Sequence, residues 1–258
     1  MASGIPELLQ SAAGFGRCKL CPYREGGSPA LCSACAQRTL EALAPEARRC
    51  RVRDQPFRDG EDECKNPVCG MSQRWFTRNY AVSMRTGVLK TAINWYKFDD
   101  KRGWAVIFGR ILVGYLDSHE AEFGDVGLIV ASPAFTGEGS HRAWDHIRLI
   151  LEMAAQEQQY RQWPFDLEEP AAVVKTAATP RMVGLTYQQR RANAEGPLRS
   201  ALLIPDPGRV RGHRVLVFDD VFTDGLTLRE VARALRAAGA AEVTGVSLAR
   251  SPFTGGGR

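Results

Sequence analysis

Residues 214–238 place the strongest constraint on the fold of this chain. An apolar run here ends in two adjacent carboxylates, Asp219 and Asp220, and continues through a short turn that contains Gly225 into an amphipathic stretch from Leu226. A buried strand that leads through a glycine-containing turn into a helix is a basic unit of open α/β sheets. Ligands of such sheets bind beyond the carboxyl ends of the strands. The turn is therefore also the first candidate for a functional site.

Apolar runs and helical periodicity elsewhere predict that further strands and helices alternate along the chain. Strands are expected at 74–85, 126–131, 171–174 and 242–249, and helices at 86–98, 103–119 and 141–163. Apolar strands that alternate with helices are typical of parallel sheets with both faces covered. The sequence therefore predicts an α/β fold, a parallel sheet with helices on both faces. His141 and His146 are expected on the surface of the helix at 141–163 and not as ligands.

The turn after the two carboxylates has the chemistry of a sugar-phosphate site. A helix N-terminus offers a phosphate its free backbone N–H groups and the positive end of its dipole. Gly225 lets the backbone approach a ligand closely, and Thr223 and Thr227 offer hydroxyl donors. The carboxylates of Asp219 and Asp220 suit ribose hydroxyls, which donate hydrogen bonds. The alternative is an ordinary strand–turn–helix unit in which aspartates only cap the helix.

All seven cysteines lie in the first 69 residues, which sets this part apart from the rest of the chain. Cys18-x2-Cys21 and Cys32-x2-Cys35 have the paired spacing of a four-thiolate structural zinc site. A short segment with few apolar positions can gain from a metal the stability that core burial does not supply. Redox-active dithiols or unrelated reduced cysteines are the alternatives.

The other three cysteines, Cys50, Cys64 and Cys69, could form a second zinc site. Cys64-x4-Cys69 is a plausible pair of ligands, and Cys50 would be the third. The fourth ligand would come from Asp62, Glu63 or elsewhere, because the first 118 residues contain no histidine. The alternative is three buried cysteines that bind no metal.

The composition is that of a globular protein. Of 258 residues, 44% are hydrophobic and 24% are charged, which argues against wholesale disorder. The longest nearly apolar stretch, 104–116, is too short to cross a bilayer and contains Arg110. No basic segment followed by an apolar run is found near Met1, so we expect a soluble, cytoplasmic protein.

The positive charge of the chain is modest. Lys and Arg number 34 against 29 Asp and Glu, and the net charge of +5 does not by itself indicate nucleic-acid binding. Aromatic and basic residues alternate from Arg74 to Arg85, an arrangement that could stack on and neutralise single-stranded DNA. A half-buried strand needs the same alternation, and core packing is the favoured interpretation.

The stretch Val215-Leu-Val-Phe-Asp219-Asp220, with the following Gly-Leu-Thr, resembles the phosphoribosyl pyrophosphate motif of type I phosphoribosyltransferases. More narrowly, residues 15–250 resemble the ComF (competence protein F) family, through the paired cysteines, the strand before two helices and the segment 179–193. The resemblance implies a phosphoribosyltransferase-like domain at 71–250, with a hood at 71–120 and a core at 121–250. It also implies a Cys-rich zinc-binding module at 15–70, a flexible N-terminus at 1–14 and a flexible tail at 251–258.

By this resemblance each part of the turn has a role. Asp219 and Asp220 would face the ribose hydroxyls as catalytic residues. Arg190 would act from a mobile loop over the site, and a loop near 132–134 would meet pyrophosphate and magnesium. Magnesium would accompany phosphoribosyl pyrophosphate, and pyrophosphate would leave as the anomeric carbon is attacked. The 5′-phosphate would be held by the turn itself, namely Thr223, Asp224, Gly225, Leu226 and Thr227.

The resemblance implies two classes of function. In the first, the chain is an accessory factor in DNA uptake and natural transformation that handles single-stranded DNA with DNA-processing proteins. In the second, it is a magnesium-dependent phosphoribosyltransferase with an unknown acceptor, or a sensor of phosphoribosyl pyrophosphate without turnover.

Three departures from the family pattern bear on this choice. Asp224 replaces the Thr or Ser of the phosphate turn, Met182 replaces a Gln, and the segment 142–146 lacks the family's Gly and amides. A carboxylate in the turn would repel a phosphate and can itself cap the helix in place of the anion. We therefore expect weak binding of the sugar phosphate.

Overall fold

The structure is a computed structural model that describes residues 48–57, 60–61, 63–140, 142–158 and 160–252. The predicted N-terminal segment 1–14, most of the predicted tail and His141 lie outside these residues. The four cysteines of the predicted structural zinc site also lie outside them, namely Cys18, Cys21, Cys32 and Cys35.

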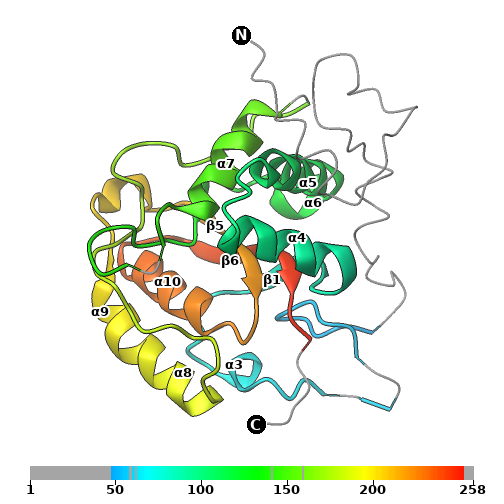
Figure 1. Cartoon of the computed structure of the whole chain (residues 1–258), viewed down its shortest axis with the longest axis vertical. Coiled ribbons are helices and arrows are strands. Elements are labelled where there is room, and N and C mark those ends of the chain that lie inside the picture. Colours follow the sequence, from blue (N-terminus) through cyan, green and yellow to red (C-terminus); the bar gives the residue numbers. More distant parts are fainter. Residues whose placement is uncertain (1–47, 58–59, 62, 141, 159, 253–258) are drawn as a thin grey trace.

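Four parallel strands form the main sheet, in the order β1-β6-β5-β2. The two central strands pair from Arg214 opposite Glu242 to Phe222 opposite Arg250. Because all neighbouring strands are parallel, their carboxyl ends meet at one edge of the sheet (Figure 1). The four strands are β1 Asn79–Met84, β2 Leu128–Ala131, β5 Arg214–Phe222 and β6 Glu242–Arg250. Two short strands, β3 Val174–Lys175 and β4 Leu202–Leu203, form a separate antiparallel pair.

Helices cover both faces of this sheet, which confirms the predicted fold class (Figure 1). On one face lie α4 Gly87–Phe98, α5 Trp104–Ser118, α6 Glu120–Phe123 and α7 His146–Gln156. On the other face lies α10 Leu226–Ala237. The remaining short elements are α3 Pro67–Gly70, α8 Tyr187–Asn193, the π-helix Ala194–Leu198, α9 Arg199–Ala201 and the 3-10 helix Pro207–Arg209.

The sheet divides the core into two apolar clusters. Successive side chains of a strand point to opposite faces, so β5 contributes to both. Leu216 and Phe218 belong to the cluster under α4, α5 and α7, together with Ile150. Val215 and Val217 belong to the cluster under α10. This alternation holds β5, which leads into the candidate turn, at the centre of the fold.

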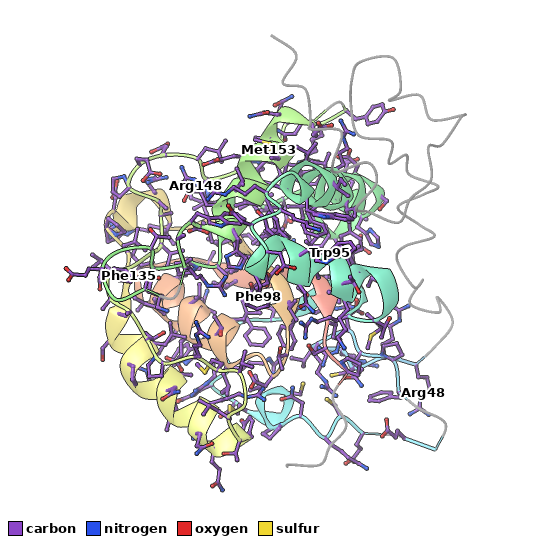
Figure 2. All side chains as sticks on the ribbon, viewed as in Figure 1. Arg48, Trp95, Phe98, Phe135, Arg148 and Met153 are labelled. Atoms are coloured by element: carbon purple, nitrogen blue, oxygen red, sulfur yellow. The ribbon has the colours of Figure 1, made fainter. Side chains whose placement is uncertain are left out.

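The two helices predicted between the first two strands are confirmed as α4 and α5. Leu89, Ala92 and Ile93 form a buried stripe along α4, as the helical spacing of its apolar residues predicts. Trp95 on α4 lies beside Trp104 on α5, with 6.4 Å between ring centroids (Figure 2). Aromatic packing therefore joins the two helices that cover the carboxyl half of the sheet.

β5 is longer than its predicted apolar run. It continues to Phe222, because its pairing with β6 does not stop where the polar residues begin. Asp219 and Asp220 therefore lie inside the strand and not beyond its end. The prediction placed them at its end because apolar character stops at Phe218, whereas backbone pairing is indifferent to side-chain polarity.

Two other elements are shorter than predicted. α7 starts at His146, because the Asp145 carboxylate accepts hydrogen bonds from the N–H groups of Ile147 at 3.0 Å and Arg148 at 2.9 Å. It ends at Gln156, and the chain then turns back to pair with β2 at Phe165. β1 starts only at Asn79, since Trp75 takes a positive φ of 69°, which no regular strand allows.

The segment 48–76 packs against the sheet domain through a buried arginine. Arg250, at the end of β6, is 0% exposed. Its Nε and Nη2 atoms donate to the Gln55 side-chain oxygen at 3.1 and 2.9 Å, and its Nη1 atom donates to the Arg53 carbonyl at 3.0 Å. Val68 and Phe76 add apolar contacts, since both belong to the cluster under α10. The end of β6 therefore depends on residues that precede the predicted domain.

We predict that a chain shortened to residues 71–258 folds but is less stable than a chain that begins at residue 48. The buried Arg250 guanidinium would lose Gln55 and the Arg53 carbonyl, which should lower the free energy of unfolding by about 2–4 kcal/mol. Urea denaturation of both chains measures this difference. Arg250→Met in the shortened chain is the control and should recover part of the loss. Equal stability of the two unsubstituted chains would show that Arg250 finds other partners.

Candidate functional site

The turn between β5 and α10 requires glycine at position 225. Gly225 has a φ of 89°, in the left-handed region that side chains rarely adopt. A Cβ atom there would also lie 2.6 Å from the Phe222 ring. Thr223 is exposed, Thr227 is half-buried and Leu226 is buried as the first residue of α10. The turn thus brings the N-terminus of α10 to the carboxyl edge of the sheet.

Asp224 fills the place that an anion would take at this helix. Its Oδ1 atom accepts a hydrogen bond from the Leu226 N–H at 3.0 Å, and its Oδ2 atom lies 3.3 Å from Nη1 of Arg190. The side chain is 13% exposed, and the backbone carbonyl of Asp224 accepts from the Asn66 side-chain amide at 3.1 Å. The sequence predicts that this carboxylate both repels a phosphate and can cap the helix, and the structure shows it accepting from the first N–H of α10, directly after the N-cap residue Gly225.

Arg190 reaches the turn from α8. Its Nε atom donates to the Leu185 carbonyl at 3.0 Å, which aims the guanidinium at Asp224. Thr186 starts α8 with a capping box in which its side chain and that of Gln189 satisfy each other's backbone N–H groups. The start of α8 is therefore fixed by hydrogen bonds, and Arg190 is held beside the turn at 223–227.

Asp220 is ion-paired beneath the turn. Its Oδ2 atom lies 2.7 Å from Nζ of Lys97 on α4 and 3.2 Å from Nε2 of His146 on α7. Nη1 of Arg142 lies 2.8 Å from the other ring nitrogen of His146. The same Nη1 atom lies 3.0 Å from Nε2, so the Arg142 guanidinium contacts both ring nitrogens of His146.

The prediction that His146 lies on a helix surface is wrong. His146 is 4% exposed. It is the first residue of α7, and the first turn of this helix approaches the carboxyl edge of the sheet, where Asp220 lies. The sequence pattern placed the helix start five residues earlier. His146 was therefore expected within the helix and not at its first position.

Asp219 and Asp220 differ in their protonation. Burial and the neighbouring Asp220 charge raise the pKa of Asp219 to about 7. Burial also favours the neutral form of Asp220, but the Lys97 ammonium and His146 outweigh it and hold the pKa of Asp220 well below its usual range. Burial lowers the pKa of His146, so its ring is neutral near pH 7. Below about pH 7 the pair is therefore a carboxylic acid next to a carboxylate.

The loop after β2 lies next to these carboxylates. The Ser132 N–H donates to the Phe218 carbonyl at 2.8 Å, directly before Asp219. Ser132 is 7% exposed. The fold therefore brings the loop near 132–134 and the turn at 223–227 to the same edge of the sheet, where Arg190 and the two aspartates also lie.

Sequence reasoning missed Lys97, His146 and Asn66, which contact the aspartates of this site. Each lies far in sequence from the aspartate that it contacts. The sequence pattern around each residue reports only the helix to which it belongs. Lys97 follows the apolar stripe of α4, and Asn66 caps α3 by accepting from the Val68 N–H at 2.9 Å. The sequence signal at Lys97 was weak, one of six lysines in a chain whose basic residues are mostly arginine.

Three cysteines gather away from the turn. Cys50, Cys64 and Cys69 have sulfur atoms that all lie within 4.8 Å of one another, an arrangement that could hold a metal ion. Cys50 is buried, and the other two are half-buried. The structure thus brings together the three residues predicted for a second metal site, whereas the four of the first site lie outside the described residues.

Two of the aromatic residues after Arg74 pack in the core. Phe76 is 3% exposed, and the Tyr80 ring packs on Phe123 with 4.8 Å between centroids. Nη2 of Arg78 lies 2.8 Å from the Asp54 carboxylate. The interpretation as core packing is confirmed for Phe76 and Tyr80, whereas Trp75 is 41% exposed.

Comparison with known families supports the fold over the C-terminal third of the chain. Residues 173–254 match the family model of the phosphoribosyl transferase domain. The match contains Arg190, β5, the turn at 223–227, α10 and β6. Together with the parallel sheet, this match over less than half of the chain supports the type I phosphoribosyltransferase fold. A search of curated proteins gave no match. No helix of the described part of the chain is long and apolar enough to cross a membrane.

We predict that Asp219 makes stability depend on pH. Its pKa is raised from 3.8 to about 7, so the folded protein keeps a proton that the unfolded chain releases. The free energy of unfolding should therefore fall as the pH rises through this window. Asp219→Asn should remove this contribution, a difference of up to about 4 kcal/mol between the proteins.

Urea denaturation at several pH values measures both curves. The lowered pKa of His146 acts in the opposite direction, but His146 is present in both proteins, so the difference between the curves isolates Asp219. Parallel curves for the wild type and the variant would show that Asp219 is ionised throughout the range.

Proposed function

We propose that this chain binds a sugar phosphate of the phosphoribosyl pyrophosphate type at the turn between β5 and α10. One observation carries the proposal: the region matched to the phosphoribosyltransferase family contains a helix N-terminus whose anion position is filled by the chain's own Asp224 carboxylate. A helix N-terminus that binds one anion can bind another of suitable shape. The 5′-phosphate of the ligand is the natural replacement.

Binding would then be an exchange of anions. The incoming phosphate would take the Leu226 N–H and the Arg190 guanidinium, both of which now contact Asp224. Thr223 and Thr227 would add hydroxyl donors. Two unit charges 4 Å apart at an effective dielectric constant of 20 interact by about 4 kcal/mol, so Asp224 must turn away for the phosphate to bind. We therefore infer weak binding.

The two aspartates fit a role in ribose recognition better than one in metal binding. Asp220 is already paired with Lys97, and Asp219 holds a proton over much of the acidic range. This donor set does not fit a magnesium ion held by the protein alone, because proteins usually hold magnesium through one or two carboxylates, and here one carboxyl group is ion-paired and the other has a raised pKa. Magnesium would instead be held by the pyrophosphate oxygens of the ligand, and the carboxylate oxygens would accept hydrogen bonds from ribose hydroxyls.

This arrangement supports ligand sensing more strongly than turnover. Transfer at the anomeric carbon requires that the developing charge of the leaving pyrophosphate be neutralised. Lys97, the cation nearest the two aspartates, is engaged by Asp220. A phosphoribosyltransferase with an unknown acceptor is the alternative for the same site.

A second candidate function is the handling of single-stranded DNA in natural transformation, which the resemblance to the ComF family implies. It is favoured by three arginines that line one cavity beside the cysteine cluster, Arg48, Arg49 and Arg51. Arginine suits contacts to phosphates of a nucleic-acid backbone. In this candidate function the chain would act in the cytoplasm together with DNA-processing proteins.

We predict that Asp224→Thr tightens the binding of phosphoribosyl pyrophosphate with magnesium. The substitution removes the competing carboxylate and adds a hydroxyl donor, and an improvement of about 1–2 kcal/mol would be roughly five- to thirtyfold in Kd. Isothermal titration calorimetry measures it. Without ligand, the variant should unfold at lower temperature, because the cap of α10 is lost.

Asp206→Thr is the matched control, since Asp206 is an exposed aspartate that also caps a short helix, by accepting from the Gly208 N–H at 2.8 Å. It should leave Kd unchanged. Tight binding by the wild type, unaffected by Asp224→Thr, would show that Asp224 does not compete with the ligand. If neither protein binds, the proposed function is wrong.

We predict for the second candidate that a fluorescent oligothymidine binds the full chain and that added salt weakens binding steeply. Replacing Arg48, Arg49 and Arg51 together by Gln should reduce the affinity and flatten the salt dependence. Fluorescence anisotropy at several salt concentrations measures both. Unchanged binding in the variant would place any DNA contact elsewhere, and no binding by the wild type would reject this candidate.

A further inference from the structure

Cys50 is held in place by a tight turn of the backbone. Its N–H donates to the Gln55 carbonyl at 2.9 Å, and its own carbonyl accepts from the Asp54 N–H at 2.9 Å. Asp54 takes a φ of 59°, which closes the turn. Arg49 and Pro56 form a bridge across its base. The Cys50 sulfur is therefore presented from a small, hydrogen-bonded loop, and this loop also supplies the partners of the buried Arg250.

Cys64 and Cys69 are held on either side of the start of α3. The Cys69 N–H donates to the Asn66 carbonyl at 3.0 Å, and Asn66 caps the helix through its side chain. Asn66 is itself buried. The two thiols therefore come from one short segment whose backbone is fixed by its own hydrogen bonds and by contact with the sheet domain.

The sulfur positions match a tetrahedral metal centre better than a disulfide. The Cys50 and Cys69 sulfurs are 3.7 Å apart. Two thiolates at the usual zinc–sulfur distance of about 2.3 Å, in tetrahedral geometry, lie roughly 3.8 Å apart. A disulfide would bring the two atoms to about 2.0 Å.

We propose that Cys50, Cys64 and Cys69 bind one zinc ion and that its fourth coordination position is exchangeable. Three thiolates and Zn²⁺ carry a net charge of −1, and cations of the chain surround them. Nε of Arg53 donates to the Cys64 sulfur at 2.9 Å. The buried Arg250 guanidinium also interacts electrostatically with all three sulfurs. Hydrogen bonds to ligating sulfurs are the outer contacts that orient ligands and tune such a metal.

The fourth position faces a cavity. A hollow of about 600 Å³ adjoins the three cysteines. No other described histidine, cysteine, aspartate or glutamate joins the sulfur cluster. Glu63 and three arginines line the hollow, so a water molecule or a small anion can reach the metal. Zinc sites with three protein ligands and a solvent molecule are open to exchange, whereas four thiolates close a site.

Metal analysis of the full chain tests the proposal. A variant with Cys18, Cys21, Cys32 and Cys35 all replaced by serine isolates the second cluster. It should retain one zinc per chain and lose that zinc when Cys50→Ser, Cys64→Ser and Cys69→Ser are added. Loaded with Co²⁺, the first variant should show thiolate-to-metal charge-transfer absorption, and Cys64→Ser should lower that absorption by about a third. Added imidazole should shift the d–d bands, because it replaces the exchangeable ligand.

Several results would overturn the proposal. One is a folded first variant, judged by circular dichroism, that holds no stoichiometric zinc or cobalt. Another is a Cys50–Cys69 disulfide found by mass spectrometry in protein prepared under reductant. Cobalt bands that do not respond to imidazole would disprove the exchangeable position. If the first variant does not fold, the zinc content of two other proteins is compared, the wild type and the variant with only Cys50, Cys64 and Cys69 replaced. The zinc content must be lower by one equivalent in this triple variant. Equal zinc content contradicts the site.

Discussion

The parallel pairing of β5 with β6 continues past the apolar part of both strands. The charged residues at their ends then require partners from neighbouring elements. Because the pairing runs to Phe222 and Arg250, Asp220 and Arg250 are enclosed at the carboxyl edge of the sheet. An enclosed charge is costly unless it is paired or hydrogen-bonded. Asp220 obtains its partners from α4 and α7, and Arg250 obtains its partners from the segment 53–55. Elements far apart in sequence are thus required at the same edge.

Several arginines are engaged in ion pairs with acidic side chains of the same chain. Glu230 on α10 is 0% exposed and is surrounded by Arg199 at 2.8 Å, Arg229 at 3.0 Å and Arg233 at 3.0 Å. These contacts tie α10 to α9 on the face opposite α4 and α7. A guanidinium can make several hydrogen bonds in a fixed plane, which suits it to such clusters. Arginine content is therefore weak support for nucleic-acid binding by this chain.

The fold was predictable from local patterns, whereas the contacts of the site were not. Apolar runs and helical spacing located β5, β6, α4, α5 and α10 within a few residues, because burial of these elements determines their composition. Their ends were less predictable: pairing carried β5 beyond Phe218, and the Asp145 cap shortened α7. The partners of Asp220 could not be found, because tertiary contacts between distant helices leave no periodicity in the sequence.

The turn itself was a mixed case. Its glycine and its place after a buried strand followed from the sequence, and so did the ability of Asp224 to occupy the helix N-terminus. The partners that Asp224 contacts there, Arg190 and the Leu226 N–H, have positions that only the folded chain defines. Charge at a helix N-terminus is a local rule. Which group supplies that charge is a question of geometry.

Asn66 joins the two chemically different parts of the chain by a single hydrogen bond. It lies two residues after Cys64 and three before Cys69, and its side-chain amide donates to the Asp224 carbonyl at 3.1 Å. A ligand that binds more tightly when this contact is formed would also favour the arrangement of the two thiols, and the converse must hold by the same factor. The cysteine cluster and the turn at 223–227 would then be linked thermodynamically, so that a ligand bound at one site changes the affinity of the other.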